Sequence, residues 1–179
     1  MTSRQGLEPA TAREARPMRK RKRRRRRLVP PDEPPRFVFV GGTGRSGTHV
    51  VAKLINRNSA YKKVPNEVRF HSDPGGFPDL LDGSTTLDEF LRKLRGEWWK
   101  GYERVRDTHR GLYRYVPEER FEAAVETFAS SFESDNKAAC RTLYIDLLWP
   151  LAEEAGAVGL VEQSCDTVAA APTLLELFP

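Results

Sequence analysis

The sequence predicts an α/β fold built on a parallel sheet, and three features indicate it. Residues 36–40 form an apolar run of β-branched and aromatic side chains, which is typical of a buried strand. Residues 158–162 form a second short run of this kind, far along the chain. Helical patterns fill most of the region between the two runs. We therefore expect two strands of one parallel sheet, with a helical insertion at about residues 84–155.

The first strand leads directly into a glycine-rich loop and then a helix. Gly41, Gly42 and Gly44 allow the backbone to turn tightly with its N–H groups pointing inward. Free N–H groups at the start of a helix favour a bound phosphate or sulfate, so the sequence predicts an anion site here. The helix is expected to bury one apolar face formed by Val50, Val51, Leu54 and Ile55.

The remaining elements are expected to be mainly helical. A long, irregular connection should begin at residue 57, with a partly extended pattern at residues 64–71. Thr86 and Glu89 have the spacing of a capping box, which predicts a helix start. Pro117 should open a second helix, and a third should span about residues 136–155. The stretch around Trp98 has no clear pattern.

The loop resembles a phosphosulfate-binding loop more closely than a nucleoside triphosphatase loop. Gly42 and Gly47 have the spacing of the nucleoside triphosphatase motif, but Thr48 and His49 stand where that motif has lysine and serine or threonine. Instead the loop resembles the 5′-phosphosulfate-binding loop of sulfotransferases, which use 3′-phosphoadenosine 5′-phosphosulfate. In that family a lysine or arginine precedes Ser-Gly-Thr, and Arg45 occupies this position. The resemblance implies that Arg45 also acts in catalysis, at the bridging oxygen. The donor-binding residues that it implies are Gly42, Thr43, Gly44, Arg45, Ser46, Gly47, Thr48 and His49.

A second motif supports the resemblance. The strand at residues 158–162 is followed by Gln163-Ser164-Cys165-Asp166 and an apolar helical stretch at residues 167–178. This is similar to the sulfotransferase segment E-K-[ST]-P, although Gln163 and Cys165 replace its lysine and proline. Ser164 and Asp166 follow the strand at its carboxyl end, where open α/β sheets bind ligands, so both are candidate acceptor or supporting residues. Capping of the final helix is the alternative role of Asp166.

The resemblance covers residues 36–179 and implies a P-loop-containing three-layer α/β/α fold with a parallel sheet. Sulfotransferases normally continue past the Leu-Phe-Pro at residues 177–179 into another strand and an arginine-containing segment that holds the 3′-phosphate. We therefore expect this chain to be the N-terminal part of a sulfotransferase domain, incomplete at its C-terminus. The implied reaction is sulfuryl transfer to a hydroxyl or amine of a small molecule, carbohydrate or protein.

An acceptor hydroxyl needs a general base, and four residues near the loop are candidates. They are Glu67, His71, Asp73 and His49. Glu67 is preferred because several sulfotransferases place a glutamate shortly after the first helix, and Arg69 is expected to orient the base or the acceptor. The alternative is a surface carboxylate of Glu67 paired with Arg69. His71 is suited to proton transfer near neutral pH, and a surface or capping role is its alternative.

The formal net charge of +5 belongs to the N-terminal tail. Residues 1–36 contain thirteen Lys or Arg and four Asp or Glu, and the remaining residues carry a net charge of −4. Arg19 to Arg27 is an unbroken basic run between prolines, so residues 1–35 are expected to be disordered. The tail is a possible contact for a polyanion such as nucleic acid or an acidic membrane face, and a solvated extension is the alternative.

Two other functions remain open at this stage. One is a non-catalytic anion- or nucleic-acid-binding protein that acts through the tail. The other is a divergent P-loop kinase, which would require ATP and magnesium. Cys140 and Cys165 are expected to be buried thiols, and the few histidines and cysteines have no metal-ligand spacing. No secretory signal or membrane-spanning apolar run is present, which indicates a cytoplasmic protein.

Overall fold

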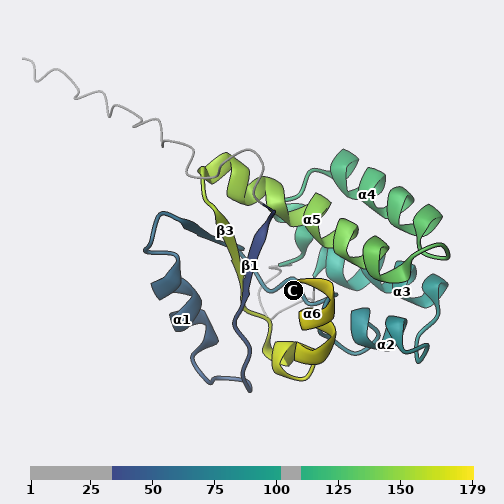
Figure 1. Ribbon diagram of the computed structural model, residues 1–179, viewed down its shortest axis with the longest axis horizontal. Coiled ribbons are helices and arrows are strands. Elements are labelled where there is room, and N and C mark those ends of the chain that lie inside the picture. The colour runs from purple at the N-terminus through teal and green to yellow at the C-terminus, as the bar shows by residue number, and fades with distance from the viewer. Residues whose placement is uncertain (1–33, 102–109) are drawn as a thin grey trace, which may run out of the picture.

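A computed structural model describes residues 34–101 and 110–179. It contains a three-stranded parallel sheet with the order β1-β3-β2 (Figure 1). The strands are β1 (Arg36–Phe39), β2 (Tyr61–Lys63) and β3 (Gly159–Glu162). Because β3 pairs with both neighbours, all four of its residues are buried, and Leu160 is in register with Phe37 and Lys62. The predicted α/β class and parallel sheet are confirmed. The basic run predicted to be disordered lies outside the described residues.

Strand β2 was not predicted from the sequence. Its residues include two lysines and span only three positions, so they carry a weak local β signal. Pairing with β3 supplies the missing stabilisation: Val158 N–H donates to the Ala60 carbonyl at 2.7 Å, and Val64 N–H donates to the Val161 carbonyl at 2.9 Å. Residues 64–71, which were expected to be partly extended, contain no strand.

Helix α1 (Thr48–Ile55) follows the glycine loop, as predicted, but its buried face was predicted wrongly. Ala52 is buried, whereas Val50, Val51 and Leu54 are 60%, 45% and 53% exposed. The helix contacts β2 and β3 through the face that carries Thr48 and Ala52. A three-stranded sheet covers only a narrow stripe of a helix, so the apolar residues beside that stripe remain in solvent.

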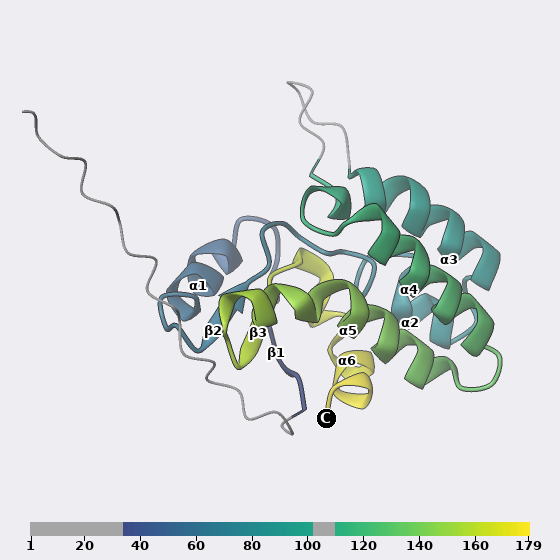
Figure 2. The same ribbon diagram turned by 90° about the horizontal axis from the view of Figure 1, so that it is seen from above.

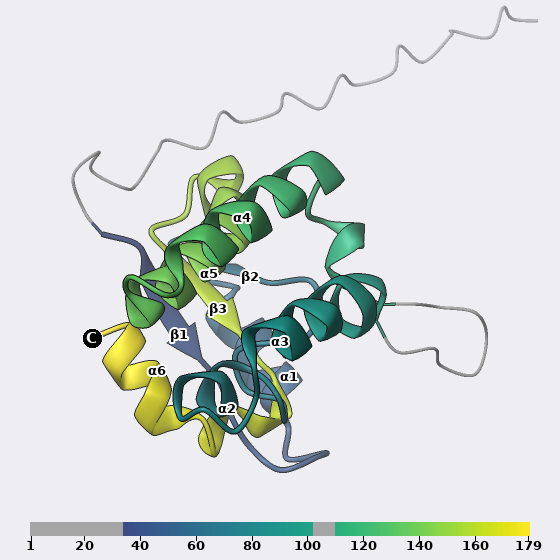
Figure 3. The ribbon, with the colours of Figure 1, turned by 90° about the vertical axis from the view of Figure 1, so that its right-hand side faces the viewer.

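The other helices lie on the opposite side of the sheet from α1 (Figure 2). Helix α5 (Asn136–Ala155) contacts β2 and β3, and α4 (Glu118–Ser131) packs along it (Figure 3). Both helices begin where the sequence predicted.

The capping box at Thr86 is confirmed at the start of α3 (Leu87–Lys93). A π-helical turn (Leu94–Trp98) continues α3 and accounts for the unassigned stretch. Two short helices complete this side, α2 (Phe77–Leu81) and α6 (Ala171–Leu177).

Aromatic side chains fill the space between the sheet and α5. The Phe37 ring of β1 lies 5.3 Å from Tyr144 and 6.0 Å from Trp149, both on α5, measured between centroids. It also lies 4.9 Å from Phe178, so the segment after α6 is anchored to the first strand. Cys140 is a buried free thiol, as predicted, but Cys165 is only partly buried because it lies in the loop after β3. None of the helices within residues 34–101 and 110–179 is long and apolar enough to span a membrane.

The exposed face of α1 provides a test of this packing. Leu54→Ser should change the free energy of unfolding by less than about 0.5 kcal/mol, because the side chain is already in solvent. Phe128→Ala should lower the free energy of unfolding by about 3–5 kcal/mol, because Phe128 of α4 is 1% exposed and its ring contacts Phe90 of α3. Urea denaturation of both variants measures the difference. An equal loss of unfolding free energy in the two variants would show that the outer face of α1 is covered.

Candidate functional site

The candidate site lies at the carboxyl edge of the sheet, where three chain segments meet. Residues 40–47 follow β1, residues 64–73 follow β2, and residues 163–168 follow β3. Because the strands are parallel, their carboxyl ends lie at the same edge. With α1, these segments contain every candidate site residue predicted from the sequence.

The loop after β1 is compact because two of its glycines allow close contacts. A Cβ atom on Gly41 would lie 2.7 Å from the Val168 backbone nitrogen, so Gly41 permits the segment after β3 to approach β1. A Cβ atom on Gly42 would lie 2.3 Å from Ser46 Oγ, because the loop folds back through a turn in which Ser46 N–H donates to the Thr43 carbonyl. Four consecutive residues at the tip are exposed and accessible to a ligand: Thr43, Gly44, Arg45 and Ser46.

Gly47 is the residue that joins this loop to α1. Its φ of 86° is left-handed, and it occupies the N-cap position without any side chain to bond the first-turn N–H groups. Arg45, two residues earlier, also has a left-handed φ of 66°. Non-glycine residues with such a backbone are often found in ligand-binding loops. Thr48 is buried at the start of the helix, whereas the side chain of His49 is exposed.

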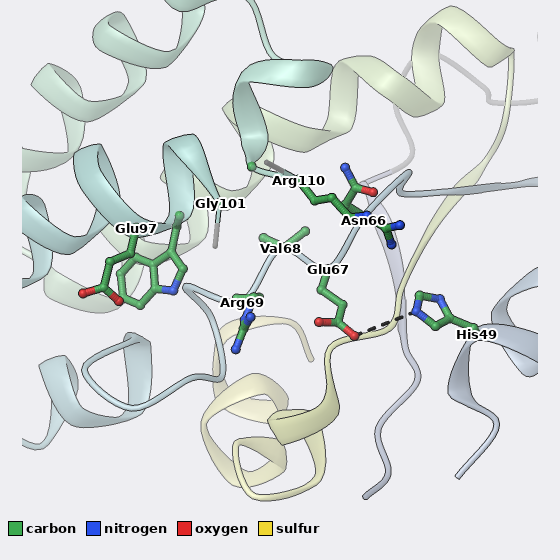
Figure 4. A pocket seen from close by; sticks show the side chains of 10 residues that line it. His49, Asn66, Glu67, Val68, Arg69, Glu97, Gly101 and Arg110 are labelled. Carbon is green, nitrogen blue, oxygen red and sulfur yellow. Dashed lines mark ion pairs between the residues drawn. The ribbon is translucent and has the colours of Figure 1, made fainter. Parts of the chain in front are cut away.

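Glu67 is the carboxylate that the structure places beside this loop (Figure 4). Its Oε1 lies 3.9 Å from His49 Nε2 and accepts a hydrogen bond from Cys165 Sγ, also at 3.9 Å. The side chain is 23% exposed, so it is held in place but still accessible. Burial, together with the charges of Glu67 and Asp166, raises the pKa of the Cys165 thiol. The thiol therefore stays protonated and can donate to Glu67.

Arg69 pairs with Asp73. Its Nε lies 2.7 Å from Asp73 Oδ2, and its φ of 72° is left-handed. Burial raises the pKa of the Asp73 carboxyl, although the charge of Arg69 and its hydrogen bond oppose the shift. The loop after β2 is thus braced by this ion pair, and the Arg69 side chain still lines the pocket described below.

A buried carboxylate at the end of β3 connects the loop after β2 to the sheet. Glu162 Oε1 accepts bonds from Val68 N–H at 3.1 Å and from the Ser164 hydroxyl at 2.6 Å. Its Oε2 accepts from Ser164 N–H at 2.9 Å and lies 3.1 Å from His71 Nε2. Arg69 N–H in turn donates to Ser164 Oγ at 3.2 Å. The segment that carries Glu67 is therefore attached to β3 and to Ser164 just beyond it at Val68, Arg69 and His71, which follow Glu67 in the chain.

The electrostatics of Glu162 favour the ionised form. Burial by itself raises the pKa of this carboxyl, but the charge interaction and hydrogen bond with His71 and the two bonds from Ser164 outweigh it, so the pKa is lowered. The glutamate was not identified as a functional residue from the sequence. The available signal was an acidic residue at the end of an otherwise apolar strand.

The structure separates the sequence-predicted residues into two groups. Glu67 and Arg69 lie at the accessible edge of the site, together with residues 42–47 and His49, whereas Thr48 is buried. His71 and Ser164 are fully buried, and both bond to Glu162. Both side chains therefore hold the site together from the inside and are closed to solvent. Asp166 is exposed, and its side chain does not cap α6, whose N-cap residue is Ala170.

A pocket of about 70 Å³ opens beside Glu67 (Figure 4). This volume has room for a few water molecules or for the reacting end of a ligand. The pocket joins the loop after β2 to the π-helical turn and to the residues that flank positions 102–109. Its lining residues are His49, Asn66, Glu67, Val68, Arg69, Glu97, Trp98, Gly101, Arg110 and Gly111.

Comparisons of the chain with protein-family models, with curated proteins and with solved structures found no match. Within the described part of the chain, no group of three or more His, Cys, Asp or Glu side chains could hold a metal ion.

The buried carboxylate predicts a specific dependence of stability on pH. Because the pKa of Glu162 is lowered on folding, its contribution is present above the unfolded-state value of about 4.3 and is lost as the pH falls through the folded-state value. Glu162→Gln should lower the free energy of unfolding by about 3 kcal/mol at pH 7. It should also flatten the loss of stability below pH 5.

Urea denaturation between pH 3 and pH 7 measures both effects. Glu153→Gln is the matched control, because Glu153 is exposed on α5 and should leave the pH profile unchanged. An acid limb that is as steep in Glu162→Gln as in the native chain would contradict the assignment.

Proposed function

We propose that this protein is a sulfotransferase that uses 3′-phosphoadenosine 5′-phosphosulfate, with a P-loop-type arrangement of the sheet and the loop after β1. The observation that carries the proposal is the position of Glu67. This carboxylate comes from the segment after β2, yet its Oε1 lies 3.9 Å from Nε2 of His49, the second residue of the helix that follows the glycine loop. A base beside an anion-binding loop is the arrangement that group transfer to a hydroxyl requires.

The glycine loop is proposed to hold the 5′-phosphosulfate of the donor. Exposed loop residues and the first N–H groups of α1 can donate hydrogen bonds to phosphate and sulfate oxygens. The Arg45 guanidinium supplies a positive charge for the bridging oxygen, where negative charge develops as the bond to sulfur breaks. This charge stabilises the leaving adenosine 3′,5′-bisphosphate.

Glu67 is proposed to act as the general base. The acceptor hydroxyl transfers its proton to the Glu67 carboxylate as its oxygen bonds to sulfur, and the bond between sulfur and the bridging oxygen breaks. The hydrogen bond from Cys165 fixes the orientation of the carboxylate, and the contacts of Glu162 and Ser164 fix the backbone directly after it, at Val68 and Arg69. Preorganisation of this kind avoids the cost of reorienting the base during the reaction.

Donor binding depends on the loop arginine in this proposal. Arg45→Ala should weaken the binding of adenosine 3′,5′-bisphosphate by at least about tenfold, because a charge-assisted bond to phosphate is lost. Isothermal titration calorimetry measures the affinity. Arg57→Ala removes an exposed arginine just beyond α1 and is the matched control.

The basic tail and the kinase alternative are addressed in the same titration. A chain without residues 1–33 should retain the affinity, since the loop is the proposed binding site. Loss of binding in that chain, together with an unaffected Arg45→Ala variant, would assign binding to the tail. Tighter binding of ATP with magnesium than of adenosine 3′,5′-bisphosphate would favour a kinase.

Glu67→Gln should separate chemistry from binding. The amide preserves the shape of the side chain but cannot accept the proton, so the rate of sulfuryl transfer should fall by about 10²–10⁴-fold. The affinity for adenosine 3′,5′-bisphosphate should stay within about twofold. Transfer of radiolabelled sulfate to acceptor measures the rate. A rate close to that of the native chain would exclude Glu67 as the base.

A further inference from the structure

One residue that lines the pocket beside Glu67, Trp98, carries a buried hydrogen-bond donor without a partner. Trp98 is 3% exposed, and its ring Nε1 has no hydrogen-bond partner. A buried donor without a partner is unfavourable, and in a binding site a ligand atom can supply the missing acceptor. Other buried polar atoms of the described residues also lack partners, but none of them belongs to a residue that lines this pocket.

Neighbouring side chains pack on the Trp98 ring, whereas its Nε1 has no hydrogen-bond partner. The ring packs against Phe90 at 5.6 Å and Phe70 at 6.5 Å between centroids. Lys93 Nζ lies 5.3 Å from the ring centroid, in a cation–π contact. Other side chains cover the ring in this way, so little of its face is left for a ligand to stack on. The indole can more readily offer a ligand the hydrogen bond of its N–H group.

Two glycines fix the wall of the pocket at this end. Gly101 has a φ of 81°, and a Cβ atom there would lie 2.3 Å from the Gly111 nitrogen. A Cβ atom on Gly111 would lie 2.0 Å from the Trp99 carbonyl oxygen, and Gly111 N–H donates to the Lys100 carbonyl at 3.2 Å. The two backbones therefore cross in direct contact next to Trp98, so the pocket wall is a built feature of the fold.

The remaining lining is mostly polar. Among the described residues, amide, imidazole, carboxylate and guanidinium groups surround the opening, and Val68 is the one aliphatic side chain. A pocket for a phenol or a lipid would be expected to present mainly apolar side chains. Hydroxyl-rich ligands suit a lining that both donates and accepts hydrogen bonds. The polar lining residues are His49, Asn66, Glu67, Arg69, Glu97 and Arg110.

We infer that the acceptor is a carbohydrate, which places one hydroxyl at Glu67 and a second oxygen on the indole N–H of Trp98. The inference rests on the proposed function, since it names the acceptor of the same site. Trp98 is then a specificity-determining residue: it distinguishes an acceptor with a second oxygen near its reacting hydroxyl from a simple phenol.

Transfer assays test the acceptor class. The acceptors are cellobiose, lactose, N,N′-diacetylchitobiose, 4-nitrophenol and a tyrosine peptide, each with radiolabelled donor. At least one saccharide should accept sulfate, with kcat/KM above that of both phenolic acceptors. Trp98→Phe should lower kcat/KM for that saccharide about tenfold, mainly through KM, and should leave donor affinity unchanged.

Trp99→Phe is the matched control. Its ring stacks on Phe121 at 4.1 Å and does not line the pocket, so the kinetics should be unchanged. The indole N–H signals in ¹⁵N-labelled protein give a readout that does not depend on turnover. The signal assigned to Trp98 by its absence in Trp98→Phe should move downfield when the saccharide is added, and the Trp99 signal should not move.

Failure of the carbohydrate inference can be distinguished from failure of the proposed function. Preference for 4-nitrophenol or the tyrosine peptide, or transfer to no saccharide while adenosine 3′,5′-bisphosphate binds, would overturn the carbohydrate inference and leave the proposed function intact. No binding of adenosine 3′,5′-bisphosphate would reject the proposed function and the inference together.

Discussion

The buried carboxylate of Glu162 is the interaction on which the arrangement of the site depends. It ends the central strand and accepts hydrogen bonds from the backbone and side chains of two other segments. Removal of a charge from water is costly, and here the bonds from Val68, Ser164 and His71 compensate for that cost. Glu67, which directly precedes the tethered Val68, is thereby held near the start of α1. The site is thus positioned by a polar contact inside the protein as well as by packing of the apolar core.

Parallel topology explains why these segments meet at all. The glycine loop, the loop that carries Glu67 and the segment after β3 lie far apart in the sequence, yet each follows a strand of the same parallel sheet. Helices α4 and α5 lie on the side of the sheet opposite α1, and α5 anchors β1 through the contacts of Tyr144 and Trp149 with Phe37. The π-helical turn at the end of α3 then brings Trp98 to the pocket beside Glu67.

Local patterns were sufficient to predict two of the strands and helices α1, α3, α4, α5 and α6, but not the short helix α2. The capping box at Thr86 and the apolar spacing within residues 136–155 are properties of a helix by itself, and both were read correctly. Strand β2 depends on pairing with β3, and its three residues give almost no local signal. The buried face of α1 depends on which part of the helix the sheet covers, so the exposed positions of Val50 and Leu54 could not be predicted from spacing alone. The same limit applies to the site: the loop was found from its motif, whereas Glu162 and Trp98 derive their roles from tertiary contacts.

We propose that the loop after β1 holds the phosphate of a nucleotide donor within reach of Glu67, and a crystal structure of the protein with adenosine 3′,5′-bisphosphate tests this. We expect the 5′-phosphate at hydrogen-bond distance, about 3 Å, from backbone N–H groups of residues 44–48 and from the Arg45 guanidinium, with Glu67 facing the same space. A nucleotide bound elsewhere on the protein, with this loop empty, would contradict it.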